Sequence, residues 1–359
     1  MSNNQNLPSK RPPQGVPRKV QRARSAPKRR TRKATPKKRY RLAFRARLLL
    51  LALFLLLVFG VSSCTKALFF GQTDAPAQSD NAKTEEKANT TATDSFASKL
   101  LSESAILINA DTGEVLYQKN PDKPLKPASL VKLMTAYTAF DLTGDRLNDK
   151  VAVPAEAFND VEEAAKSGLL PNELVSIKDL LYCAILPSGG DAAQALALVT
   201  DTSIGSFVDK MNANAEKLGM TETHYVNVVG LDAPGQLTTA RDVSKLMQKI
   251  VNDDRFLEIL SADHYTTSQS AEHGNGKLVF HTLKSKINDY LKTDAIKGYN
   301  IVGGKTGYTT EAGICLASVA RNDRGDTYIA VTLKAGGDVN NYYPAIKDAV
   351  SLYNLAFNQ

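Results

Sequence analysis

The feature that most constrains this chain is a short apolar stretch that contains a single lysine. It covers residues 127–136 and reads Pro-Ala-Ser-Leu-Val-Lys-Leu-Met-Thr-Ala. Ser129 and Lys132 lie three residues apart, so on a helix the two side chains share a face and can meet. A helix that is apolar nearly all round lies in a protein interior, and we therefore expect Lys132 to be buried.

Burial of this lysine has a chemical consequence. Desolvation penalises the charged form of an amine and lowers its pKa. A neutral amine beside a serine hydroxyl is a general base next to a nucleophile. The same spacing also fits a purely structural interpretation. In it, Ser129 caps the helix, and the apolar stem of Lys132 extends along the surface so that its charged amine reaches water. The rest of the chain has to decide between these two interpretations.

The positive charge of the chain is concentrated near its N-terminus. Residues 1–47 contain 17 Lys and Arg and no Asp or Glu, whereas the remainder has 28 basic and 37 acidic residues. Such a polar tail cannot form a core and is expected to be disordered. Residues 48–65 are almost entirely apolar and about long enough to span a bilayer. Because the basic residues precede this span, the positive-inside rule places the tail in the cytoplasm.

These segments predict a single-pass membrane protein. Residues 48–65 would be an uncleaved signal anchor, and the basic tail would act as topology signal and lipid contact rather than bind nucleic acid. Val-Ser-Ser-Cys ending at Cys64 is also similar to a lipoprotein cleavage sequence, although the long basic region favours the anchor. Residues 66–99 are polar and predict a flexible extracytoplasmic linker. The folded, extracytoplasmic domain is expected at residues 100–359.

Strand patterns lie at both ends of this predicted domain. Residues 105–109 and 115–119 are apolar runs joined by Asp-Thr-Gly, which predicts a β-hairpin. Further strands are predicted at residues 278–280, 301–302, 314–320 and 328–333. The middle, residues 175–251, is mostly helical by pattern, and residues 345–357 form a closing amphipathic helix. We therefore expect an α+β fold with one antiparallel sheet formed from both ends and an inserted helical subdomain.

Two later stretches resolve the ambiguity of the Ser129–Lys132 pair. Ser188 lies in Leu-Pro-Ser-Gly-Gly-Asp, at a break between two predicted helices, and Lys305 and Thr306 lie in Gly-Gly-Lys-Thr-Gly-Tyr-Thr at the start of a strand. Taken singly, these residues would be a helix cap, a surface charge and a strand filler. The ordered set Ser-x-x-Lys, Ser-x-(Asn), Lys-Thr-Gly is instead typical of penicillin-recognising serine acyltransferases.

From about residue 104 to residue 357 the chain resembles the D-alanyl-D-alanine carboxypeptidases, the low-molecular-weight penicillin-binding proteins. Besides the three motifs, family-typical sequences occur at residues 108–113, 180–193, 227–232, 239–242 and 312–316. The resemblance implies a penicillin-binding protein/β-lactamase-like fold. It also implies a serine-type carboxypeptidase that removes the terminal D-alanine from peptidoglycan stem peptides ending in D-Ala-D-Ala, with β-lactams as covalent inhibitors.

The resemblance assigns the catalytic roles to three side chains. Ser129 would attack the carbonyl between the two D-alanines and form an acyl-enzyme, and Lys132 would take its proton. Ser188, together with Lys305, would relay that proton to the leaving D-alanine. No cofactor is implied, and the four histidines show no metal-ligand spacing, so no metal site is expected.

The same resemblance makes the Lys-Thr-Gly strand the substrate-binding element. Lys305 and Thr306 would bind the terminal carboxylate of the substrate by charge-assisted hydrogen bonds. Gly307 and Tyr308 would continue this binding strand. The backbone N–H groups of Tyr308 and Ser129 would form the oxyanion hole.

Three positions depart from the family pattern. Gly190 replaces the asparagine of the second motif, and residues 334–349 contain no arginine that could bind the substrate carboxylate. Residues 281–284 read His-Thr-Leu-Lys, where Asn-x-Asn-Lys or Asn-x-Asn-Arg is usual. Because glycine cannot make the hydrogen bonds of asparagine, we expect a slow carboxypeptidase, with a water in part of the vacated space. Gly190→Asn should then accelerate acylation, unless Gly190 has a positive φ.

Two alternative functions follow from the same motifs. A class A β-lactamase also needs Glu-x-x-x-Asn, and Glu222 and Asn227 have the wrong spacing. A second alternative is a catalytically impaired domain that binds stem peptides or partners, which the substitution at Gly190 favours.

Overall fold

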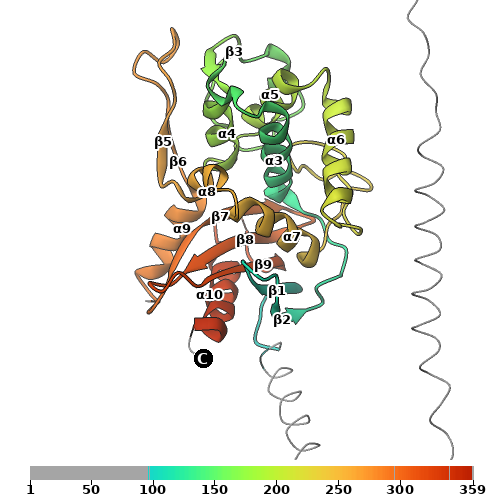
Figure 1. Cartoon of the computed structure of the whole chain (residues 1–359), viewed down its shortest axis with the longest axis vertical. Coiled ribbons are helices and arrows are strands. Elements are labelled where there is room, and N and C mark those ends of the chain that lie inside the picture. The colour runs from blue at the N-terminus through green and yellow to red at the C-terminus, as the bar shows by residue number, and fades with distance from the viewer. Residues whose placement is uncertain (1–95, 97, 295, 339, 358–359) are drawn as a thin grey trace, which may run out of the picture. The chain divides into compact units, whose positions relative to one another are not determined.

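A computed structural model of the chain describes residue 96 and residues 98–357, apart from residues 295 and 339. Its main sheet has five antiparallel strands in the order β2-β1-β9-β8-β7 (Figure 1). The strands are β1 (Ser104–Asn109), β2 (Val115–Lys119), β7 (Asn300–Thr309), β8 (Gly313–Arg321) and β9 (Thr327–Ala335). Because β1 pairs directly with β9, both ends of the domain build one sheet. This confirms the predicted α+β fold.

Both faces of the sheet are covered, which explains the apolar strand sequences. Ile106 and Ile108 of β1 belong to the cluster of buried side chains that includes the helical subdomain. Their neighbour Leu107 belongs to the cluster on the opposite face, which includes helix α10 (Tyr343–Phe357). Because successive side chains point to opposite faces, a strand covered on both sides is apolar at every position.

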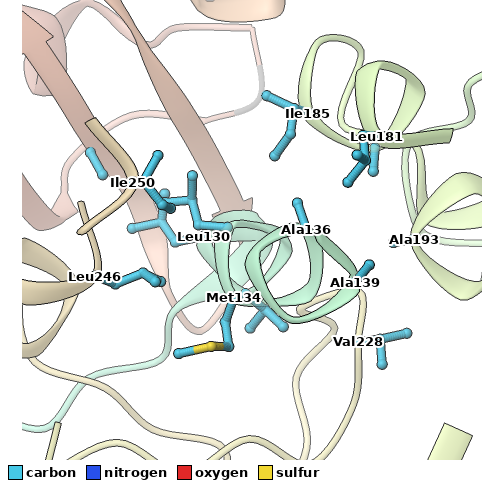
Figure 2. Packing of buried hydrophobic residues seen from close by; sticks show 14 of the residues in the cluster. Leu130, Met134, Ala136, Ala139, Leu181, Ile185, Ala193, Val228, Leu246 and Ile250 are labelled. Carbon is cyan, nitrogen blue, oxygen red and sulfur yellow. The ribbon is translucent and has the colours of Figure 1, made fainter. Parts of the chain in front are cut away.

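The helical subdomain is built around helix α3 (Val131–Thr143), which follows the 3₁₀ turn Ala128–Leu130. The other helices are α4 (Ile177–Ile185), α5 (Gly190–Thr200), α6 (Ile204–Lys217), α7 (Ala240–Val251), α8 (Asp254–Ser261) and α9 (Thr282–Leu291). Figure 2 shows Ala136 and Ala139 of α3 near Leu181 and Ile185 of α4. Side chains of α7 and α5 surround the same helix, so α3 is buried nearly all round, as its sequence predicted.

Two sequence expectations differ from the structure. The strand predicted at residues 278–280 exists as β6 (Leu278–Phe280), but it pairs with β5 (His264–Thr266) in a separate two-stranded sheet. A second small sheet joins β3 (Lys150–Ala152) and β4 (Leu174–Ser176). The predicted helical middle is interrupted by a non-helical stretch of residues 218–239. A three-residue strand has too little pattern to specify its partner, which explains the first difference.

The predicted tail at residues 1–47, the anchor at residues 48–65 and most of the linker at residues 66–99 lie outside the described residues. Within the part of the chain that the structure describes, no helix is both long enough and apolar enough to cross a membrane.

Candidate active site

The three sequence motifs meet at one cavity of about 370 Å³. It is lined by the motif residues Ser129, Ser188, Thr306, Gly307 and Tyr308. They come from the turn before α3, from the loop between α4 and α5, and from strand β7. The two motif lysines lie beneath the cavity surface, with Lys132 0% and Lys305 1% exposed. The structure therefore brings together all the residues that the sequence predicted for the site.

Lys132 contacts Ser129 in the geometry that a general base would need. Its Nζ lies 3.0 Å from Ser129 Oγ and donates a hydrogen bond to the Val229 carbonyl at 2.6 Å. Burial lowers the pKa of the amine to about 7, while the negative charge of Asp191 acts in the opposite direction. Helix α3 begins without a side-chain cap, so the interpretation of Ser129 as a helix cap with an exposed Lys132 is wrong.

Lys305 and Ser188 form a second lysine–serine pair. Lys305 Nζ donates to Ser188 Oγ at 2.8 Å and to the Thr306 carbonyl at 2.8 Å. Burial, together with the nearby charge of Lys132, places the pKa of Lys305 well below its usual value. Lys305 is therefore not a surface charge. Two amines with lowered pKa values lie next to two hydroxyl groups, which is an arrangement suited to proton transfer.

The backbone at both serines is constrained. Ser188 has a φ of 65° and Ala128, directly before Ser129, has a φ of 47°. Non-glycine residues occupy this left-handed region only where the surrounding structure holds them there, and such residues cluster at functional sites. For Ser188, the restraint comes from the turn between α4 and α5, where Gly189 N–H donates to the Cys183 carbonyl at 3.0 Å.

Gly307 allows strand β7 to pass close to Ser129. A Cβ at this position would lie 2.9 Å from the Ser129 backbone nitrogen and 3.0 Å from the Ala128 Cβ. The main chain that carries Tyr308 therefore runs close to the Ser129 amide, as an oxyanion hole formed by these two residues requires.

At Gly190 the structure answers one question that the sequence left open and corrects one expectation. Gly190 does not have a positive φ, and the space beside it is not open to water. A Cβ at Gly190 would lie only 2.6 Å from the Ala164 Cβ, and the Gly190 N–H donates to the Ala165 carbonyl at 2.7 Å. The loop that carries these alanines is anchored by Asp191, whose carboxylate accepts from Ser167 N–H and Oγ–H at 2.9 Å each. Ala164 thus fills the place where an asparagine side chain would begin.

Other residues of the site were missed by the sequence analysis. The Val229 carbonyl accepts from Lys132, and Asn227 Oδ1 holds this turn by accepting from the N–H groups of Val229 at 3.2 Å and Gly230 at 2.7 Å. The family-typical sequence at residues 227–232 was the available signal. Ala164 had no such signal, because its loop carries none of the motifs.

The segment at residues 281–284 has a structural function in this chain. His281 Nδ1 caps α9 by accepting from the Leu283 N–H at 3.2 Å, and its Nε2 lies 3.0 Å from the Leu260 carbonyl. Burial lowers the pKa of His281 to about 4, which keeps the ring neutral. This segment therefore starts the helix that brings Lys286 to the cavity wall. No group of His, Cys, Asp or Glu within the described ranges could hold a metal ion.

The chain matches known proteins over most of its described length. It is 35% identical to D-alanyl-D-alanine carboxypeptidase DacC of Escherichia coli over 65% of this chain and 56% of that protein. It is 31% identical to D-alanyl-D-alanine carboxypeptidase DacF of Bacillus subtilis over 61% of this chain and 54% of that protein. The match thus spans just over half the length of these relatives. The solved structure of penicillin binding protein 5 from Haemophilus influenzae is similar with a TM-score of 0.63 and 26% identity, over 72% of each chain.

The sequence model of the D-alanyl-D-alanine carboxypeptidases, peptidase family S11, matches residues 87–337. This range includes all three motifs and all the strands of the main sheet. The chain therefore belongs to the D-alanyl-D-alanine carboxypeptidase family.

Proposed function

We propose that this chain is a serine-type carboxypeptidase that removes the terminal D-alanine from peptidoglycan stem peptides ending in D-Ala-D-Ala. The observation that carries the proposal is the buried amine of Lys132, with a pKa lowered to about 7 and its Nζ 3.0 Å from Ser129 Oγ. Membership of the family and the names of the relatives support the same reaction. β-Lactams would acylate the same serine and inhibit the enzyme.

Acylation begins with proton transfer from Ser129 to Lys132. A neutral lysine amine has one lone pair, and because one of its N–H groups is engaged by the Val229 carbonyl, the lone pair can face Ser129 Oγ. The oxygen then bonds to the carbonyl carbon between the two D-alanines. The negative charge that develops on the carbonyl oxygen would be stabilised by the N–H groups of Ser129 and Tyr308, each worth about 3 kcal/mol of barrier.

Release of D-alanine needs a proton on its nitrogen as the carbon–nitrogen bond breaks. In this proposal, Ser188 Oγ donates that proton, and Lys305, at 2.8 Å from Ser188 Oγ, is part of the relay that restores it. Through this relay the proton on Lys132 replaces the one that Ser188 donates, so Lys132 is neutral again and one proton has passed from Ser129 to the leaving amine. A water molecule then gives a proton to Lys132 and attacks the acyl carbon, and the proton returns to Ser129 as the shortened peptide leaves.

The two alternatives have less support. A domain that only binds peptides would not need a base 3.0 Å from a serine hydroxyl, yet Ser129 and Lys132 keep this geometry despite the glycine at position 190. The β-lactamase alternative still lacks a Glu-x-x-x-Asn sequence in the region of Glu222 and Asn227, where the spacing is wrong. We therefore expect a slow enzyme rather than an inactive one, because a missing hydrogen bond in the transition state costs about 2–4 kcal/mol.

We also infer a membrane-bound, extracytoplasmic enzyme. The support is the charge asymmetry of the sequence: 17 basic residues in residues 1–47 and an apolar run at residues 48–65. Residues 66–99 would then separate the membrane from a domain at residues 100–359, within reach of the cell wall. Protease added to intact cells should digest the domain and spare an epitope in residues 1–47.

The proposed reaction is tested by mass spectrometry and product release. Wild-type protein exposed to a labelled penicillin should gain the mass of one adduct on Ser129, and it should release D-alanine from a peptide ending in D-Ala-D-Ala. Ser129→Ala should lose both activities. A well-folded wild-type protein that forms no adduct and releases no D-alanine would support the binding domain instead.

A further inference from the structure

One lysine in the wall of the active-site cavity has no assigned role. Lys286, on α9, lines the cavity together with Ser129 and Thr306. It is the only Lys or Arg among the described residues that line this cavity. Its side chain is partly exposed, with Nζ 5.7 Å from the ring centroid of Tyr342. The cavity therefore has a single cationic group at its surface.

The fold gives this cation an aromatic neighbour, Tyr342, but no ion-pair partner among the described residues. Within the described ranges no Asp or Glu forms an ion pair with Lys286, and Asp289, one turn further along α9, pairs instead with Lys292 at 2.8 Å. Lys284, on the same helix, contacts Asp263 at 3.0 Å and lines neither this cavity nor the adjacent one. Because an unpaired charge at a cavity wall gains most from an anionic ligand, Lys286 favours a carboxylate there.

Lys286 lies on the same side of the cavity as Thr306 and Tyr342. Thr306, which is expected to bind the terminal carboxylate, interacts with the Tyr342 hydroxyl, and Lys286 lies over the Tyr342 ring. Lys286 and Tyr342 also line a second cavity of about 230 Å³ between α9 and α10, so they form the wall where the two cavities adjoin. The three side chains thus follow one another along one side of the active site.

The two buried lysines, Lys132 and Lys305, are poorly suited to provide the positive charge that faces a substrate carboxylate. Burial lowers the pKa of both Lys132 and Lys305, and both amines already donate to backbone carbonyls. Residues 334–349 contain no arginine. Lys286 is therefore the group on the cavity surface that remains available to neutralise a substrate anion.

We propose that Lys286, supported by Tyr342, binds the C-terminal carboxylate of the substrate and so selects peptides that end in a free D-alanine. The inference rests on the proposed carboxypeptidase function and names the group that recognises its substrate. A peptide whose terminal carboxylate is blocked, as in a cross-link through that residue, would lose this interaction.

Binding measurements in a Ser129→Ala background test the inference without turnover. The probes are an N-acylated tripeptide ending in D-Ala-D-Ala and the same peptide with a C-terminal carboxamide, titrated into the full chain by isothermal calorimetry. Adding Lys286→Ala should raise the Kd of the carboxylate peptide by about 10- to 100-fold, the loss expected for one hydrogen bond between charged groups. The Kd of the carboxamide should stay close to that of the Ser129→Ala parent.

Two further variants make the result specific. Lys286→Arg should restore most of the affinity, because it keeps the charge, and Lys284→Ala should leave both Kd values unchanged. An equal loss with both peptides, or no loss with either, would overturn the inference. Failure of the proposed function has a different signature, namely wild-type protein that forms no penicillin adduct and releases no D-alanine.

Discussion

The contact between Gly190 and Ala164 allows a quantitative prediction. In Gly190→Asn the new Cβ would lie 2.6 Å from the Ala164 Cβ, whereas carbon atoms pack best at about 3.5–4.0 Å. Relieving this overlap requires movement of the loop that carries Ala164, and overpacking of this kind typically costs about 1–3 kcal/mol. For a domain of this size, that cost corresponds to a melting temperature lower by roughly 2–12 °C.

A double-mutant cycle separates this clash from other effects of the asparagine. Ala164→Gly removes the obstructing Cβ, and on its own should cost about 0.5–1 kcal/mol in backbone entropy. The double variant should melt well above the value expected from adding the two single effects, with a coupling free energy of about 1–2 kcal/mol. The melting temperature of each of the four proteins is measured by differential scanning calorimetry.

The same four proteins test the catalytic consequence. Gly190→Asn alone should not accelerate acylation by labelled penicillin, because its side chain cannot enter the site without displacing the loop. The double variant should acylate faster than Ala164→Gly, since an amide can then reach the position where the family has asparagine. If Gly190→Asn melts at the wild-type temperature, or if Ala164→Gly restores nothing, Ala164 does not occupy this space and our reasoning is refuted.

Three more predictions follow from the site. Because the pKa of Lys132 is lowered to about 7, its amine holds a proton below that pH, so acylation at low penicillin concentration should fall about tenfold per pH unit as the pH drops. A rate that stays constant from pH 7 to pH 5 would contradict this role of the amine. Lys132→Met should fold and melt cooperatively but acylate about 100- to 10,000-fold more slowly, since the base is lost while the volume is kept. Asn227→Ala should slow acylation about tenfold by freeing the turn that holds the Val229 carbonyl. The control for Asn227→Ala is Asn212→Ala, which removes two hydrogen bonds to Tyr225 and should lower the melting temperature without slowing acylation.

Much of the fold could be predicted from local patterns. The apolar residues around Lys132 predicted a buried helix. The three-residue spacing of Ser129 and Lys132 predicted that their side chains meet on one helix face. The paired apolar runs at both ends of the domain indicated one sheet, and the structure pairs β1 with β9 accordingly. These features depend on helix and strand periodicity, which a sequence shows directly.

The order of the motifs also identified the candidate site. Ser129, Ser188 and Thr306 are far apart in the sequence but line one cavity. Periodicity alone could not have placed them together, because it says nothing about how distant segments pack. The prediction was possible only because the ordered set is typical of one class of acyltransferase.

Contacts between segments without motifs were decided by the tertiary structure alone. Ala164 reaches Gly190 across a loop whose path is set by Asp191, and Lys286 reaches the cavity because α9 lies beside β7. Neither position has a local pattern that distinguishes it from an ordinary surface residue. The sequence by itself therefore predicted the candidate nucleophile, its candidate base and the sheet, because these depend on spacing within single elements. The filling of the asparagine position by Ala164 and the placement of Lys286 in the cavity wall depend on how separate elements pack, and only the folded structure specifies them.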